Sequence, residues 1–372
     1  MLELDILRGF AMLVVVSSHV SSISIENLIS GRGHFLTSML HSSFNFSVPI
    51  FFIVGAALSA RSVAGRKVDI WPYYKKKLIR IILPYLAWTL IYTLFKIAIS
   101  KTTWDDLLVF NNWFEWISQG RAYDHLYYLI VIGQFHLLFP LLIKLARLVK
   151  DKPFWAFVIV IAGHNIVYWL NKFWLADVFP YFASSFFWHF SLFFLGLYLG
   201  LNYEKVCLWL KRNLKWALIV CVASAAGFLY MAYLLYYNNY SIIPQFNYFY
   251  STIRLVYVTS LPLCLLAAAR NPRFIHGPPG RCLLWIGRYS FGIYLAHPIL
   301  NYFVRSWVTS NDVTILFFVS VLAVVALIII CGFLSKLLEL FRPTAWLVGV
   351  KARRGPSLSD HKPHIGNFHK PM

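Results

Sequence analysis

Acidic side chains are scarce in this chain of 372 residues, which has 14 aspartates and glutamates against 34 lysines and arginines. Only Glu3 and Asp5 fall within an expected membrane segment, and both lie in its first turn. Proton- and sodium-coupled transporters usually place a carboxylate at mid-membrane to bind the ion, so this distribution counts against that class. The paired-carboxylate chemistry of glycosidases has no obvious position within the membrane either.

Several other functional signatures are missing. The sequence has no Gly-rich phosphate loop, no soluble basic module that would bind nucleic acid and no cleavable signal peptide. The five cysteines show neither a disulfide framework nor the paired spacing of a metal site: Cys207, Cys221, Cys264, Cys282 and Cys331. We therefore predict no bound metal, no permanently bound cofactor and no nucleic-acid partner.

Apolar residues dominate what is present. Hydrophobic residues make up 59% of the chain and charged residues 13%, and the mean hydropathy is +0.65, which is typical of a membrane protein. Runs long enough to cross a bilayer predict about ten spans: 4–24, 44–60, 79–99, 126–144, 154–174, 181–201, 215–236, 250–269, 286–304 and 313–338. We expect the second span to be extended outward from about Phe35. The predicted fold is all-α, a polytopic transmembrane helix bundle in the cell membrane.

Basic residues are distributed unevenly between the two sides of this bundle. All but seven of the 34 lysines and arginines fall on the side that holds the N-terminus, so that side is cytoplasmic by the positive-inside rule. An even number of spans puts both termini there. The net charge of +20 is thus mainly a topology signal. We expect a membrane domain over 1–340 and a basic, disordered cytoplasmic tail over 341–372. The seven residues expected outside are Arg32, Lys96, Lys101, Arg121, Lys172, Arg254 and Arg305.

Arg8 and His19 are the most informative pair of residues in the first span. On an α-helix, their spacing amounts to about 1100°, so the two side chains share one face to within roughly 20° and lie roughly 16 Å apart along the axis. A histidine at that depth titrates near neutral pH and is a candidate functional group. The alternative is a histidine that is hydrogen-bonded to a neighbouring helix, and the residue alone does not decide between the two.

Five short segments carry a family resemblance: Leu4–His19, Ser47–Gly55, Lys77–Tyr85, His125–Tyr128 and Ser290–Pro298. In this order, and with ten expected spans, they resemble motifs of the acyltransferase-3 family of integral membrane acyltransferases. That family has an arginine, ten residues and a histidine in its first span, as Arg8 and His19 do here. Each motif is weak singly, but five in order are specific.

Some positions depart from the family pattern. Val54 precedes Gly55 where the family commonly has a serine, so no role of that serine carries over. The family's Arg-x-x-Arg is present as Lys77-x-x-Arg80, which keeps the charge but loses the bidentate fork at position 77. Tyr127 stands where many members have tryptophan. The chain resembles the short, stand-alone form of the family.

The resemblance implies transfer of an acyl group, usually acetyl, from a cytoplasmic acyl-CoA, here acetyl-CoA, to a hydroxyl of a glycan or lipid-linked sugar. A neutral imidazole at His19 suits this chemistry as a general base, or as the carrier of an acyl-imidazole. Because the donor is polyanionic, we assign its binding to Arg8, Lys77 and Arg80 at the cytoplasmic end. Arg8 has the alternative role of fixing its helix through Asp5.

Acceptor-binding candidates are His297, His125, Trp113 and Trp116. Pro298 follows His297 inside the ninth span, where it would free a carbonyl and kink the helix. The tryptophans lie with carboxylates in the outer segment 100–125, a composition that suits sugars but also an interfacial aromatic belt. The remaining membrane histidines, His136, His164 and His189, match no motif and are interpreted as hydrogen-bonded core residues.

Two other classes of protein remain as alternatives. One is an exporter of a glycan or small molecule without transferase activity. The other is a non-catalytic membrane scaffold, which leaves a buried His19 unexplained.

Overall fold

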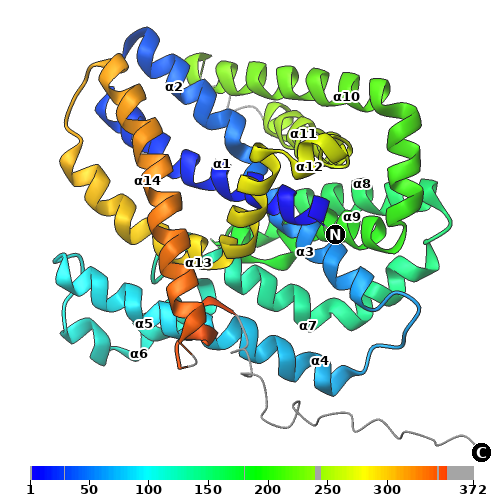
Figure 1. Cartoon of the computed structure of the whole chain (residues 1–372), viewed down its shortest axis with the longest axis horizontal. Coiled ribbons are helices and arrows are strands. Elements are labelled where there is room, and N and C mark those ends of the chain that lie inside the picture. The colour runs from blue at the N-terminus through cyan, green and yellow to red at the C-terminus, as the bar shows by residue number, and fades with distance from the viewer. Residues whose placement is uncertain (1, 29, 180, 239–243, 342, 350–372) are drawn as a thin grey trace, which may run out of the picture.

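The computed structural model describes residues 2–28, 30–179, 181–238, 244–341 and 343–349, and within them every regular element is helical. Long helices cross one another throughout the molecule (Figure 1). Eight helical segments of this part of the chain are long and apolar enough to span a membrane: Leu2–Asn27, Gly31–Ser62, Ile70–Ala98, Asp124–Leu148, Pro153–Leu175, Tyr203–Leu235, Phe246–Ala269 and Val313–Leu340. The all-α polytopic bundle predicted from the sequence is confirmed.

Two of the ten expected spans fall on helices outside this set of eight. The segment 181–201 contains a shorter apolar helix, Phe186–Leu201, and 286–304 lies within the 30-residue helix α13, Pro278–Trp307. Helix α13 carries Arg288, His297 and Arg305, which lower its apolar character. Much of α13 is buried in the bundle, so its polar groups are not all turned toward lipid.

Two spans are assembled from consecutive helices. The second consists of α2 (Gly31–Ser43), the 3₁₀ turn η1 (Phe44–Phe46) and α3 (Ser47–Ser62), which confirms the extension expected from Phe35. The third consists of α4 (Ile70–Lys77), the π-helical segment η2 (Leu78–Ile82) and α5 (Leu83–Ala98). Single π-turns of this kind are rare and occur often at functional sites. Here the segment includes Arg80.

The other elements follow in chain order. Helix α6 (Phe110–Gln119) lies between the short turns η3 (Asp105–Leu108) and η4 (Asp124–Leu126). The next helices are α7 (Tyr127–Leu148), α8 (Pro153–Leu170) with the π-helical η5 (Asn171–Leu175), and α9 (Phe190–Leu201) after the turns η6 (Phe182–Ser184) and η7 (Phe186–His189). Helix α10 (Tyr203–Asn238) bends at Asn213, and α11 (Pro244–Ala269), α12 (Pro272–His276) and α14 (Val313–Leu340) complete the bundle (Figure 1).

Helix α1 (Leu2–Asn27) lies at the centre and packs against α13, α14 and α3. It crosses α13 at two glycines. A methyl group at Gly9 would lie 1.9 Å from the carbonyl oxygen of Leu283, and one at Gly287 would lie 2.1 Å from that of Asp5. Small residues let membrane helices approach to backbone contact. The α1–α13 interface therefore depends on glycine at both positions.

A second close crossing joins α3 to α9. Methyl groups at Gly196 and Gly200 would each lie 2.3 Å from a carbonyl oxygen of α3, that of Ile53 and that of Ala57. The small-x-x-x-small pair at Gly196 and Gly200 thus serves close helix packing, as its spacing predicts.

The chain past α14 turns back onto the bundle. Residues Ala345–Val348 form a 3₁₀ turn, η9, in which Ala345 and Val348 are buried, and the Trp88 indole N–H donates to the Leu347 carbonyl at 3.0 Å. The packed unit thus extends through residue 349, beyond the boundary at residue 340 expected from sequence. Residue 342 and residues 350–372, which make up most of the expected tail, lie outside the described residues.

Candidate functional site

His19 and His297 meet along the interface between α1 and α13. Their ring centroids are 5.0 Å apart with an interplanar angle of 62°. The helices run parallel, because Gly9 contacts the backbone at Gly287 and the two histidines follow ten positions later on both. The glycine crossing therefore sets the distance between the two imidazoles.

His125 joins this pair from the turn η4. Its ring centroid lies 6.0 Å from that of His297 and 4.8 Å from that of Tyr92. The Tyr294 hydroxyl of α13 donates a hydrogen bond to the main-chain oxygen of His125, which ties η4 to α13. Three residues predicted as site candidates, His19, His125 and His297, thus come together from three separate segments.

The ring nitrogens of these histidines are largely without partners. Both nitrogens of His125 and Nε2 of His297 are buried with no hydrogen-bond partner among the described residues, and no hydrogen bond is formed to the His19 ring within them. Nδ1 of His297 lies 3.0 Å from the Ile293 carbonyl oxygen. Because a carbonyl can only accept, this contact requires the proton on Nδ1 and leaves Nε2 of a neutral His297 as an acceptor.

A cavity of about 270 Å³ opens beside His19. Four basic residues and one carboxylate, Asp124, are among the residues that line it. The full lining is His19, Lys96, Lys101, Arg121, Ala122, Tyr123, Asp124, His125, Pro298, Asn301, Tyr302 and Arg305. Its four lysines and arginines are four of the seven expected on the outer side, so the cavity faces that side of the expected topology.

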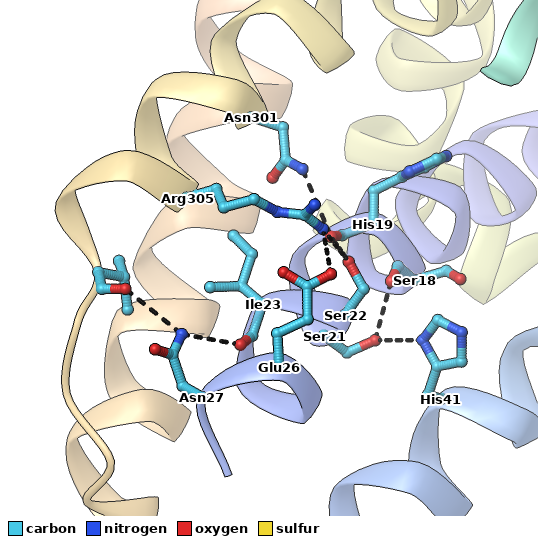
Figure 2. A network of polar contacts seen from close by, with 11 residues as sticks. Ser18, His19, Ser21, Ser22, Ile23, Glu26, Asn27, His41, Asn301 and Arg305 are labelled. Carbon is cyan, nitrogen blue, oxygen red and sulfur yellow. Dashed lines mark hydrogen bonds and ion pairs between the residues drawn. The ribbon is translucent and has the colours of Figure 1, made fainter. Parts of the chain in front are cut away.

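Figure 2 shows how α13 holds α1 around His19. The Asn301 amide donates to the His19 carbonyl oxygen at 3.4 Å. Arg305 contacts the Ser22 hydroxyl at 2.9 Å and a Glu26 carboxylate oxygen at 3.0 Å. These bonds fix the backbone at His19 while its ring projects away from the Arg305–Glu26 pair (Figure 2). The ring is therefore free to contact a bound molecule.

The residues assigned to the donor have separate neighbours. Arg8 is hydrogen-bonded to the Ser290 hydroxyl at 3.1 Å and paired with Asp5 at 3.4 Å. The alternative role of Arg8, an ion pair with Asp5, is thus observed. Arg80 is exposed in η2. No contact joins Arg8 to Lys77 or Arg80 within the part of the chain that the structure describes.

Lys77 is turned toward α7 instead of the α1–α13 interface. Its ammonium lies 3.1 Å from Nε2 of His136, and the Tyr73 hydroxyl lies 2.6 Å from Nδ1 of the same ring. The interpretation of His136 as a hydrogen-bonded core residue is confirmed.

The two tryptophans proposed to bind the acceptor do not line the cavity. The Trp113 indole donates to the Leu107 carbonyl at 2.9 Å, and the Trp116 carbonyl accepts from the Tyr85 hydroxyl at 2.9 Å. Both anchor α6 to its surroundings. Trp116 approaches the cavity through Lys96, whose ammonium lies 5.9 Å from its ring centroid.

Sequence reasoning missed the residues of α13 beyond His297. Asn301 and Arg305 follow His297 at successive intervals of four, which places all three on one helix face. This spacing was visible in the sequence. The gathering of Lys96, Lys101 and Arg121 around the same cavity was not, because it depends on how η4 and α5 pack.

A metal site is not evident among the described residues, where no group of three or more His, Cys, Asp or Glu side chains is arranged to hold an ion.

Comparison with known proteins identifies the class. The family model described as an acyltransferase domain, acyltransferase-3, matches residues 1–335. The chain belongs to this family of integral membrane acyltransferases, and it is a multi-pass membrane protein.

Curated relatives cover nearly the whole chain. A protein of Staphylococcus aureus strain MRSA252 named "probable poly-beta-1,6-N-acetyl-D-glucosamine export protein" is 24% identical over 357 residues, which are 92% of this chain and 94% of the relative. A Staphylococcus epidermidis protein of the same name is 24% identical over 359 residues, 92% of this chain and 93% of that one. No solved structure matches the chain.

Proposed function

We propose that this protein is a membrane O-acyltransferase that moves an acyl group, most simply acetyl, from cytoplasmic acyl-CoA to a hydroxyl of a cell-surface glycan or lipid-linked sugar. One observation carries the proposal: the His19 imidazole lines a polar cavity and has no hydrogen bond to its ring within the described residues. An ordinary core histidine would have a partner there. A free ring beside an accessible cavity suits proton transfer.

In the direct mechanism, the acceptor hydroxyl oxygen attacks the thioester carbonyl carbon while a His19 ring nitrogen takes the hydroxyl proton. The carbon–sulfur bond then breaks, and the imidazolium returns the proton to the departing thiolate. The products are an ester and free CoA. General-base catalysis of this kind typically contributes about 10²–10⁴-fold.

A covalent route uses the same residue. A His19 ring nitrogen attacks the thioester carbonyl carbon, the carbon–sulfur bond breaks, and the proton on the other ring nitrogen passes to the CoA thiolate. The acceptor hydroxyl oxygen then attacks the acyl carbon, the bond from that carbon to the ring nitrogen breaks, and the hydroxyl proton returns to the imidazole. This route predicts ping-pong kinetics and an acyl-enzyme that accumulates without acceptor, whereas the direct route requires both substrates together.

The donor and acceptor are proposed to approach from opposite ends of α1. Arg8, Lys77 and Arg80 are assigned to the donor phosphates at the cytoplasmic end, roughly 16 Å from His19 along the helix in the case of Arg8. His125 and His297 are assigned to the acceptor, because His125 lines the cavity and the His297 ring lies 5.0 Å from that of His19 and 6.0 Å from that of His125. Trp116 would act on the acceptor only indirectly, through Lys96.

The name of the relatives favours a second candidate, export of a glycan such as poly-β-1,6-N-acetylglucosamine. The two activities separate in one experiment. Purified protein is mixed with acetyl-CoA and a surface-glycan extract, and both CoA release and ester formation are measured. In parallel, a deletion strain is compared with wild type for the amount of surface glycan and for its ester content.

An acyltransferase should release CoA with matching ester formation, and deletion should remove the esters while glycan remains at the surface. His19→Ala should reduce transfer by about 10²–10⁴-fold at equal membrane abundance. His164→Ala, in α8 and outside the cavity lining, is the matched control and should stay within a few-fold of wild type. Loss of surface glycan with unchanged esterification would favour export.

A further inference from the structure

Helix α5 ends in a turn that places two lysines side by side at the His19 cavity. The N–H of Lys101 donates to the Lys96 carbonyl at 2.8 Å, and that of Ser100 donates to the Ile97 carbonyl at 3.0 Å. Ser100 has a φ of 57°. These two bonds around the left-handed residue Ser100 form a Schellman motif. The motif brings Lys101, the residue after Ser100, close to Lys96, four residues before Ser100.

The chemistry of this turn is unusual. Schellman motifs commonly have an apolar contact between the two positions that Lys96 and Lys101 occupy here. Two ammonium groups at these positions repel each other, and a nearby anion is what relieves such repulsion. The turn therefore concentrates positive charge at the cavity.

Among the described residues, carboxylates form ion pairs with the other cations of the cavity but not with these two lysines. Arg121 is paired with Glu115 at 2.8 Å and Arg305 with Glu26 at 3.0 Å. Neither Lys96 nor Lys101 has a carboxylate ion pair among the described residues. Each ammonium lies over an aromatic ring instead, 5.9 Å from the centroid of Trp116 and 5.5 Å from that of Tyr302.

Ring contacts orient an ammonium without cancelling its charge. Asp124 is the only carboxylate among the residues that line the cavity. Asp124 and Asp106 attract Lys96, but within the described part of the chain neither forms an ion pair with Lys96 or Lys101, so both ammonium groups remain available to a bound anion.

We propose that Lys96 and Lys101 bind an oxyanion of the acceptor, so that the acylated hydroxyl belongs to a saccharide that carries a carboxylate or a phosphate. This inference rests on the proposed acyltransferase function. The oxyanion belongs to the acceptor because the lysines lie on the expected outer side, whereas the donor phosphates are assigned to the opposite end of α1.

Direct binding tests this inference without catalysis. Three matched saccharides are titrated against purified protein in a nonionic, phosphate-free detergent, with saturation-transfer NMR as the readout: methyl β-glucoside, methyl β-glucuronide and methyl β-glucoside 6-phosphate. The phosphate-free detergent removes lipid headgroups as competitors. We expect at least one anionic saccharide to bind about tenfold or more tightly than the neutral one, as a charge-assisted hydrogen bond allows. Added salt should reduce the difference.

Variants connect the preference to the two lysines. The double variant Lys96→Gln/Lys101→Gln should bind all three saccharides alike, while Lys96→Arg/Lys101→Arg should keep the preference because it keeps the charge. Lys172→Gln, at another outer lysine that does not line the cavity, is the control and should behave as wild type. The idea is wrong if wild type shows no anion preference, or if Lys172→Gln loses it equally.

His19→Ala separates this inference from the proposed function. The variant should retain the anion preference in binding. Preference in binding without acylation of any acceptor by wild type would refute the acyltransferase function and leave the lysine site standing. Acylation of the glucoside and of both anionic saccharides with equal kcat/KM would support the acyltransferase and overturn the lysine site.

Discussion

Substitution of Gly9 by alanine should disable the site from a distance. A methyl group at Gly9 would lie 1.9 Å from the Leu283 carbonyl oxygen, where ordinary contact begins at 3.4 Å, so α1 and α13 would have to separate by roughly 1.5 Å. His19 lies ten residues further along α1 and depends on α13 for its contacts with His297 and Asn301. Misplacement of reacting groups by about 1 Å can cost about 10²-fold in rate.

We therefore expect Gly9→Ala to lower acyl transfer by about 10²-fold in protein that still inserts. The assay is CoA release per mole of folded protein, with membrane abundance and size-exclusion behaviour measured on the same sample. Gly227→Ala is the matched control, because a methyl group there would meet only the side chain of Ile253, at 3.5 Å. It should be near wild type. Activity of Gly9→Ala within twofold of wild type would refute the argument that the glycine crossing positions His19.

Three further outcomes follow from other contacts. Arg8→Gln should raise the KM for acyl-CoA and be rescued by excess donor, whereas His19→Ala should lower kcat with donor affinity intact; equal losses of kcat in both would contradict this division. Ser100→Gly should raise the free energy of unfolding by up to about 1 kcal/mol, because Ser100 has a φ of 57°, which glycine adopts without a Cβ penalty. The melting temperature should rise accordingly, and an unchanged or lower value would show that the turn is not strained. Hydrogen bonds from the Thr103 amide and hydroxyl and from Thr102 lower the pKa of Asp106. The ionised carboxylate therefore stabilises its loop at pH values above the usual aspartate pKa, and this stabilisation is lost as pH falls through the lowered pKa. Hydrogen exchange of residues 99–108 should then be faster at pH 3 than at pH 5 beyond the intrinsic difference, and Asp106→Asn should remove the change; equal protection at both pH values would argue against it.

The fold was predictable from sequence because it rests on long local signals. Apolar runs place the helices, and the Gly196–Gly200 spacing marks a close contact whichever helix provides the partner. Helix α13 was less apolar than the other spans, since some of its polar side chains form hydrogen bonds and an ion pair with α1. Its apolar run was still long enough to predict the span 286–304, and the motif Ser290–Pro298 marked the same segment independently.

Only the site residues that belong to sequence motifs could be predicted from the sequence. His19, His125 and His297 were each singled out, but their convergence depends on the parallel α1–α13 crossing, which no periodicity specifies. In the sequence, Lys96 and Lys101 stood out only as two of the few basic residues on the outer side. Their shared place at the cavity could not be predicted, because it depends on a turn with a left-handed serine. Trp113 and Trp116 are residues typical of a sugar-binding site. In the structure, however, the Trp113 indole N–H donates to a backbone carbonyl, and the two rings pack against each other and hold α6 in place.

The turn η9 matters for how the protein is handled in the laboratory. Its Leu347 carbonyl accepts from Trp88, and Gly349 lies beside Phe291 and the Arg80 carbonyl, next to a residue assigned to the donor. A purification tag or reporter fused directly after α14 would remove this packed turn and expose the indole of Trp88. Fusion points beyond residue 349 keep it. Topology reporters placed there would mark the expected cytoplasmic side without disturbing the end of the bundle that acyl-CoA is proposed to enter.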